Sequence, residues 1–204
     1  NVCIVDEART IQESYLVAKR RLQQRFYEGF GHVLHASKQV QLSTFDPLLT
    51  PTQQQALLNS LEALNIDEFT QILQPLRQHY FEQEDVRVHL TSILAQIRRF
   101  MISYNLEENI SLEENFKRLY RLIIEHPILY KILEEITLFT SALMQAVYTI
   151  QQQQSASYVT QAKNYIESYY ANYDLSLQTV ASSLGINANY LSTLFSKEEG
   201  ESFN

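Results

Sequence analysis

The stretch Leu175–Gly185 has the sequence LSLQTVASSLG, which contains the signals of a short helix that ends in a tight turn. Ser176 stands where a helix N-cap belongs, because its hydroxyl can accept a hydrogen bond from the first-turn N–H groups. Gly185 follows the last apolar position and can adopt the left-handed backbone that a tight turn requires. Asn187 then caps a further helix that runs to Gly200. Two short helices joined around a glycine predict a helix-turn-helix.

The residues around this motif predict a small core of three helices. A preceding helix has apolar residues at Val159, Ala162 and Ile166 and ends at Asn172–Asp174. Ala181 is small, which allows the second helix to cross the third closely. The apolar positions expected to form the shared core are Val180, Leu191, Leu194 and Phe195. The positions left facing outward on the last helix are Ala188, Asn189, Ser192, Thr193 and Ser196.

Three of these outward positions share one face of the helix. Asn189, Ser192 and Thr193 are spaced i, i+3 and i+4. An Asn amide can pair with an adenine edge in the major groove, and Ser and Thr can contact base edges or phosphate. Lys197 and Lys163 are candidate phosphate contacts. The alternative is that these polar side chains face solvent and bind nothing.

Segment 158–204 resembles the first helix-turn-helix of the AraC/XylS family of transcription regulators. The resemblance lies in LSLQTVASSLG and in Asn187, Tyr190, Leu191, Ser192, Leu194, Phe195, Lys197, Glu198, Gly200, Ser202 and Phe203. It implies that double-stranded DNA is the partner and that the DNA-binding residues are Asn187, Ala188, Asn189, Ser192, Thr193, Ser196 and Lys197. It also implies a linking helix and a second helix-turn-helix beyond this point, so we expect the domain to be truncated here.

The charge of this segment opposes DNA binding. From Tyr158 onward there are two Lys, no Arg and five acidic residues, which gives a net charge of −3, and the whole chain carries −7. A duplex-binding surface needs cations to displace the counterions of the phosphates. We therefore expect this chain by itself to bind DNA weakly, with much of the affinity supplied by the missing part.

Upstream, the spacing of apolar residues and capping signals predicts a helical bundle over 37–150 with a regulatory or dimerisation role. Thr50–Gln53, Asn65–Glu68 and Ser111–Glu114 each have the capping-box spacing. The expected helices cover 51–64, a stretch from Asn65 to about Tyr80 that Pro75 kinks or splits, then 86–104, 112–125 and 127–150.

The last helix of this bundle has apolar residues in steps of three and four, the pattern of a coiled-coil seam. This seam predicts a homodimer. The positions of this seam are Leu129, Ile132, Ile136, Phe139, Leu143 and Ile150. The apolar residues Leu133, Leu138, Met144 and Val147 widen the stripe, which favours a helix buried inside a bundle. Both interpretations stay open on the sequence.

Two further segments complete the expected organisation. Residues 1–36 are predicted to form an N-terminal amphipathic linker helix, with apolar positions that include Ile11, Tyr15 and Phe26. The polar run Gln151–Ser155 breaks the apolar pattern and predicts a Gln-rich linker over 151–157. The expected fold is therefore all-α, a helical bundle followed by a truncated three-helix helix-turn-helix subdomain.

This layout is similar to that of YesN-like response regulators of two-component systems, in which a phosphorylatable receiver precedes the linker. Residues Ile4–Glu7 resemble the acidic strand end that opens a receiver, but the alternating strands and helices that should follow are missing. The resemblance implies a sensor kinase that acts through a receiver absent from this chain.

Other classes of function have little support. No apolar run reaches the roughly 20 residues that cross a membrane, and the lone Cys3 forms no internal disulfide, so we expect a cytoplasmic protein without a membrane partner. His32 and His35 lack further ligands nearby, which argues against a metal, and we expect no cofactor. Adjacent carboxylates such as Glu107 and Glu108 diverge on a helix, and no nucleophile motif is present, so we expect no enzyme.

Three functions therefore remain. The first is a DNA-binding regulator whose helical middle region relays phosphorylation or dimerises. The second is an AraC-type regulator whose helical domain senses a small-molecule ligand. The third is a helical protein-interaction module in which the helix-turn-helix is only structural.

Overall fold

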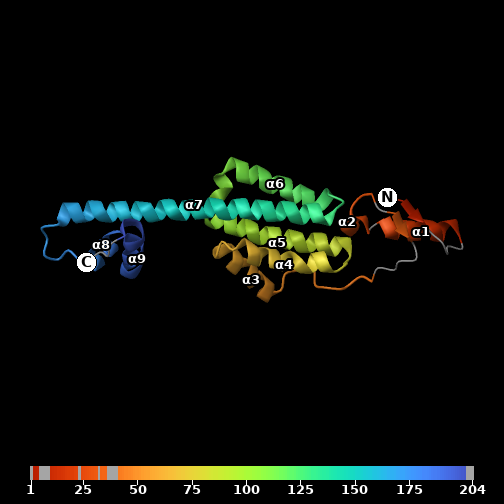
Figure 1. The fold of residues 1–204 in the computed structure, drawn as a ribbon, viewed down its shortest axis with the longest axis horizontal. Coiled ribbons are helices and arrows are strands. Elements are labelled where there is room, and N and C mark those ends of the chain that lie inside the picture. Colours follow the sequence, from red (N-terminus) through yellow and green to blue (C-terminus); the bar gives the residue numbers. More distant parts are fainter. Residues whose placement is uncertain (1, 5–9, 23, 32, 36–40, 201–204) are drawn as a thin grey trace. The chain divides into compact units, whose positions relative to one another are not determined.

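The computed structural model describes residues 2–4, 10–22, 24–31, 33–35 and 41–200 (Figure 1). The chain divides into two compact units, 1–145 and 146–204. Both are helical, and within the described residues the fold is all-α apart from one pair of three-residue strands.

The first unit opens with the order β1 (Val2–Ile4), α1 (Ile11–Leu22), α2 (Arg25–Glu28) and β2 (Val33–His35). The two strands pair in parallel, with Val2 opposite Val33. The expectation of a single amphipathic helix over 1–36 is therefore wrong. Gly29 ends α2 with a φ of 80°, and Val33–His35 further along the chain are extended and pair with β1.

The apolar stripe expected in this region does not form one buried face. Ile11 is 91% exposed, whereas Phe26 is only 1% exposed. The anchor of the region is α2, because the Tyr27 hydroxyl donates to the Phe81 carbonyl and accepts from the Phe81 N–H, both at 2.9 Å. Burial raises the pKa of Tyr27 to about 12, which keeps this hydroxyl protonated and able to donate.

The bundle follows with α3 (Pro51–Glu62), α4 (Ile66–Gln78), α5 (Gln83–Ser103), the 3₁₀ turn η1 (Leu106–Glu108), α6 (Ile110–Glu125) and the first part of α7 (Leu129–Tyr169). The Thr50 and Asn65 caps form as expected. The cap of α6 is Asn109, whose side chain accepts from the Leu112 N–H, and not the expected Ser111. Pro75 lies inside α4 without splitting it.

The bundle core lies between these helices, and Figure 1 shows α5, α6 and α7 running beside one another. The Phe116 and Phe139 rings are 6.0 Å apart and join α6 to α7. Arg118 and Glu135 form an ion pair at 3.0 Å across the same two helices. The fully buried side chains of the core include Leu57, Leu61, Phe69, Leu73, Leu90, Ile93, Ile97, Met101, Ile123 and Ile132.

The predicted coiled-coil seam on α7 belongs to this core. Five of its six positions are buried within the chain itself, namely Leu129, Ile132, Ile136, Phe139 and Leu143, and Ile150 is half-buried. A side chain that its own chain covers cannot pack against a second copy in this fold. The structure therefore assigns the stripe to the bundle interior, the interpretation that its extra width favoured.

The Gln-rich run does not form a linker. Residues 151–157 lie inside α7, which is 41 residues long, and the division between the two units falls earlier, after Gln145. Gln has a favourable helix propensity, so a polar run without Gly or Pro continues the helix. The Ser155 hydroxyl donates to the Gln151 carbonyl at 2.9 Å, which satisfies this hydroxyl within the helix.

The length of α7 does not make it a membrane span. No helix among the described residues is apolar over a long enough stretch to cross a membrane.

His89 is an ionisable group inside the core of the first unit. It is 4% exposed, and its Nδ1 lies 3.2 Å from the Pro47 carbonyl, which can only accept. The Phe45 ring packs against the imidazole with centroids 5.1 Å apart. Burial lowers the pKa of His89 below its ordinary 6.5, so the folded chain holds a neutral ring with its proton on Nδ1.

Acid should therefore destabilise the first unit through His89. Because the folded pKa is lowered, the unfolded chain binds the extra proton more readily, so stability is complete above about pH 6.5 and falls as the pH drops below it. Urea unfolding followed by circular dichroism at several pH values measures this. His89→Gln should remove part of the pH dependence, whereas His79→Gln, at an exposed position, should leave it unchanged.

A charge on the buried stripe of α7 should unfold the bundle. Ile136 is 0% exposed and Leu138, two residues further along, is 60% exposed. Ile136→Asp should cost about 4 kcal/mol or more, since it buries an unpaired carboxylate. Leu138→Asp should change stability by only about 0.5 kcal/mol. A folded, monomeric Ile136→Asp chain by light scattering and circular dichroism would restore the dimer-seam interpretation.

Candidate nucleic-acid interface

The second unit contains the end of α7 followed by α8 (Leu177–Ser183) and α9 (Ala188–Glu199). Its centre is a small apolar cluster of Ala162, Val180, Ala181 and Leu191. Because Ala181 presents only a methyl group at 1% exposure, α8 can approach α9 closely. Around the centre pack the partly buried side chains of Tyr165, Ile166, Leu175, Leu177, Leu184, Ile186, Ala188 and Phe195.

The start of α8 has the local chemistry that the sequence predicts. Ser176 forms a full capping box with Thr179: the Ser176 Oγ accepts from the Thr179 N–H at 3.2 Å, and the Thr179 hydroxyl accepts from the Ser176 N–H at 2.9 Å. The same Thr179 hydroxyl lies 2.8 Å from the Asp174 carbonyl. The loop that enters α8 is therefore fixed by side chains that the sequence places next to it.

The turn between α8 and α9 also forms as expected. Gly185 has a φ of 69°, the left-handed conformation, and the next N–H, that of Ile186, donates to the Ala181 carbonyl at 3.0 Å. Asn187 caps α9 through its Oδ1, which accepts from the Asn189 N–H at 2.8 Å. Gly200 ends α9 in the left-handed conformation. The turn and the caps together fix the rotation of α9 about its own axis, and therefore which face of the helix packs on the small core.

The rotation of α9 about its own axis decides which of the predicted DNA-contact residues are exposed to solvent. Five of the seven are exposed, namely Asn187, Asn189, Thr193, Ser196 and Lys197. Ser192 is half-buried. Ala188 packs against the core cluster, so its expected outward position is wrong. The reason is that Ala188 begins α9 directly after the cap, where the helix still faces Ile186 and α8.

The exposed polar face has a defined hydrogen-bonding capacity. The Thr193 hydroxyl donates to the Asn189 carbonyl at 2.9 Å within the helix, and the side chain as a whole is exposed. The Asn189 side-chain amide offers both a donor and an acceptor, the combination that pairs with an adenine edge. Asn189 and Thr193 therefore form an adjacent pair that can contact a base and a thymine methyl group.

The cations of the second unit differ in their availability. Lys163 of α7 forms an ion pair with Glu199 of α9, with Nζ 2.5 Å from Oε2. A phosphate at Lys163 would have to compete with this carboxylate. Lys197 is exposed in the last turn of α9 and is the better candidate for a phosphate contact.

The sequence interpretation missed a group of exposed tyrosines. Tyr169 is exposed at the end of α7, and so are Tyr170 and Tyr173 in the following loop. Tyr190 on α9 is also exposed and meets Tyr158 of α7 edge-on, with ring centroids 6.5 Å apart. Tyr hydroxyls donate to phosphates without adding charge. The signal that could have found them is the density of Tyr in a segment with only two Lys.

Residues of the metal-ligating type do not gather anywhere in the described part of the chain. The His32 and His35 pair cannot be assessed in this way, because His32 and the side chain of His35 lie outside the described residues.

Comparison with protein-family models, with curated protein sequences and with solved structures finds no match to this chain. A function for α8 and α9 must be argued from their geometry and from the sequence resemblance.

Gly185→Ala should loosen the turn between α8 and α9. A Cβ at this position meets no atom within 4 Å, so the cost is the left-handed backbone alone, about 1 kcal/mol. Amide hydrogen exchange resolved over α8 and α9 should speed up about fivefold. Ser182→Ala, an exposed change on α8, should leave exchange unchanged, and equal exchange rates in the two variants would contradict this role of Gly185.

Proposed function

We propose that the chain is part of a sequence-specific DNA-binding transcription regulator of the AraC/XylS type, in which α9 contacts the major groove. The observation that carries the proposal is the polar face of α9. Asn189 and Thr193 face solvent, while Leu191 on the opposite side is buried against α8. A helix held from behind by a second helix, with polar side chains in front, has the form of a recognition helix.

In this proposal the residues of α9 divide into two roles. Asn189 and Thr193 contact base edges, and Ser192 is close enough to the same face to contribute from its half-buried position. Asn187, Ser196 and Lys197 contact phosphates at the two ends of the helix, which positions α9 without selecting a sequence. The exposed tyrosines add uncharged phosphate donors.

The net charge of −3 from Tyr158 onward limits the affinity of this unit by itself. Each phosphate contact gains affinity through counterion release, and a surface with one exposed lysine on α9 gains little. Specific binding then depends on additional cations from a second copy of the chain or from a further part of the DNA-binding domain. The helical bundle of the first unit would supply regulation.

Two forms of regulation are proposed, and each has an observation that favours it. The parallel pairing of β1 with β2, which α1 and α2 connect, is a small α/β unit of the kind that receivers contain. This favours a two-component response regulator controlled by a sensor kinase. A cationic pocket on the bundle supports direct sensing of a small molecule instead.

Weak DNA binding by α9 should be detectable by nuclear magnetic resonance. An isotope-labelled chain titrated with a short duplex at roughly 50 mM salt should show amide shifts concentrated at 187–197, because non-specific binding is strongest at low ionic strength. Lys197→Gln should make the plot of log affinity against log salt concentration less steep, reducing the magnitude of its negative slope by about 0.9, the value of one phosphate contact.

The matched control is Gln161→Ala, an exposed polar change on α7 away from the α9 face. It should leave both the shifts and the salt slope unchanged. Absence of shifts at 187–197, or shifts confined to the bundle, would contradict the DNA-binding proposal and favour the protein-interaction module.

A further inference from the structure

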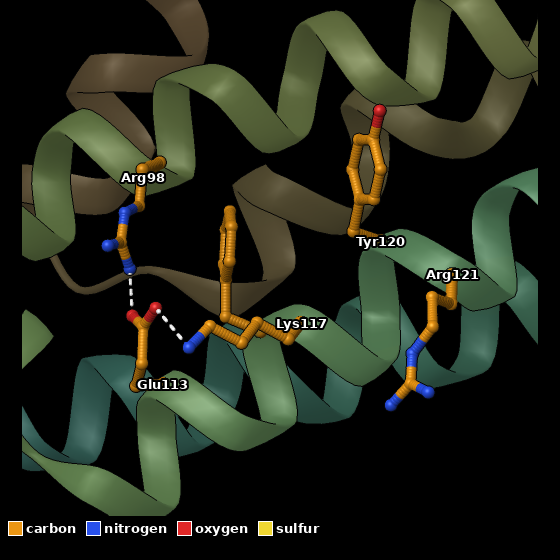
Figure 2. A pocket seen from close by; sticks show the side chains of 6 residues that line it. Arg98, Glu113, Lys117, Tyr120 and Arg121 are labelled. Carbon is orange, nitrogen blue, oxygen red and sulfur yellow. Dashed lines mark hydrogen bonds and ion pairs between the residues drawn. The ribbon is translucent and has the colours of Figure 1, made fainter.

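A shallow pocket of about 540 Å³ lies on the first unit between α5 and α6 (Figure 2). This volume is within the range of small-molecule sites. Arg98 comes from α5, and the other lining residues come from successive turns of α6: Glu113, Phe116, Lys117, Tyr120 and Arg121.

The charge of the pocket is opposite to that of the chain. Three cations and one carboxylate give its lining a net charge of +2, whereas the whole chain carries −7. Figure 2 shows Arg98, Glu113 and Lys117 grouped together and Arg121 further along α6, with Tyr120 rising from the helix between them. An anion is therefore attracted to this pocket in preference to the surrounding acidic surface.

The pocket already holds one anion that belongs to the protein. Glu113 pairs with Arg98 through Oε2 and with Lys117 through Oε1, the latter at 3.4 Å. The hydrogen bond from Arg98, followed by that from Lys117, lowers the pKa of Glu113 below its ordinary value. A carboxylate is thus a fitting partner at this place, and Glu113 competes with any carboxylate from outside.

The remaining surface of the pocket is aromatic and partly fixed in place. The Arg98 guanidinium lies 5.0 Å from the centroid of the Phe116 ring, and that ring also contacts Phe139 of α7. Tyr120, one turn beyond Phe116, is exposed. Among the described residues, Arg121 has no ion-pair partner. A ring can pack on Tyr120 while its anionic group meets Arg121.

We infer that this pocket binds a small organic anion with an aromatic body, such as an aromatic carboxylate, with Glu113 as an internal competitor for the cations. The ring packs against Tyr120 and Phe116, and the anionic group is held by Arg121. The positive charges of Arg98 and Lys117 attract the same anion from the other end of the pocket, and Glu113 weakens this attraction because it neutralises part of their charge. The inference concerns the first unit and does not depend on DNA binding, so either proposal can fail without the other.

The test uses 4-fluorobenzoate as the probe and follows broadening of its fluorine resonance when the chain is added. The wild-type chain should broaden this signal. The signal of neutral 4-fluorobenzyl alcohol should broaden much less, because the alcohol lacks the anionic group. Inorganic phosphate, which lacks the ring, should displace 4-fluorobenzoate only weakly. Equal binding of the neutral alcohol would overturn the inference.

Two substitutions should move the affinity in opposite directions. Glu113→Gln removes the internal competitor and should tighten 4-fluorobenzoate binding about threefold to tenfold, and Arg121→Gln should weaken it by a similar factor. The matched controls change the same charges outside the pocket: Glu114→Gln and Arg99→Gln, both at exposed positions, should leave the affinity unchanged.

Circular dichroism shows whether each variant folds. If Glu113→Gln unfolds because it loses the Arg98 pair, the comparison of Arg121→Gln with Arg99→Gln decides alone. No broadening with the wild-type chain, or the same affinity in Arg121→Gln as in the wild type, would overturn the inference.

Discussion

The close contact of α8 with α9 at Ala181 is the constraint on which the functional surface depends. A core of Ala162, Val180, Ala181 and Leu191 is too small to hold two helices unless one of them presents a methyl group at the crossing. The left-handed Gly185 then reverses the chain within a few residues. Once Leu191 is buried, the 3.6-residue period leaves Asn189 and Thr193 in solvent. The burial of Leu191 on one side of α9 thus determines that the polar residues lie on the opposite, exposed side.

A single helix supplies side chains to the cores of both units. α7 contributes Ile132, Ile136 and Leu143 to the bundle and Ala162 to the cluster beneath α8 and α9. Between these two apolar stretches lies the glutamine run, which has no core to enter and stays helical through its propensity and internal hydrogen bonds. The two cores are therefore separate packing units to which one continuous helix contributes.

The features that the sequence predicts well are those set by neighbouring residues. Ser176, Gly185 and Asn187 act on backbone groups a few positions away, so their roles follow from spacing alone. The features that the sequence does not predict are those set by contacts between residues far apart in the chain. The two strands within residues 1–36 form because β1 and β2 pair with each other across about thirty residues of chain. The pocket likewise needs Arg98 from α5 and Arg121 from α6, and the packing of the bundle brings these two helices together. The linker expected over 151–157 does not form, because a polar run can end a core without ending a helix.

The most direct test of the central claim is site-specific photo-cross-linking of the chain to a duplex. A p-benzoylphenylalanine in place of Thr193 lies on the proposed DNA face of α9, and the same group in place of Thr160 lies on an exposed position of α7. Cross-links should form from position 193 and not from position 160, and they should map to bases in the major groove. Equal yields from the two positions, or cross-links from position 160 alone, would contradict the central claim.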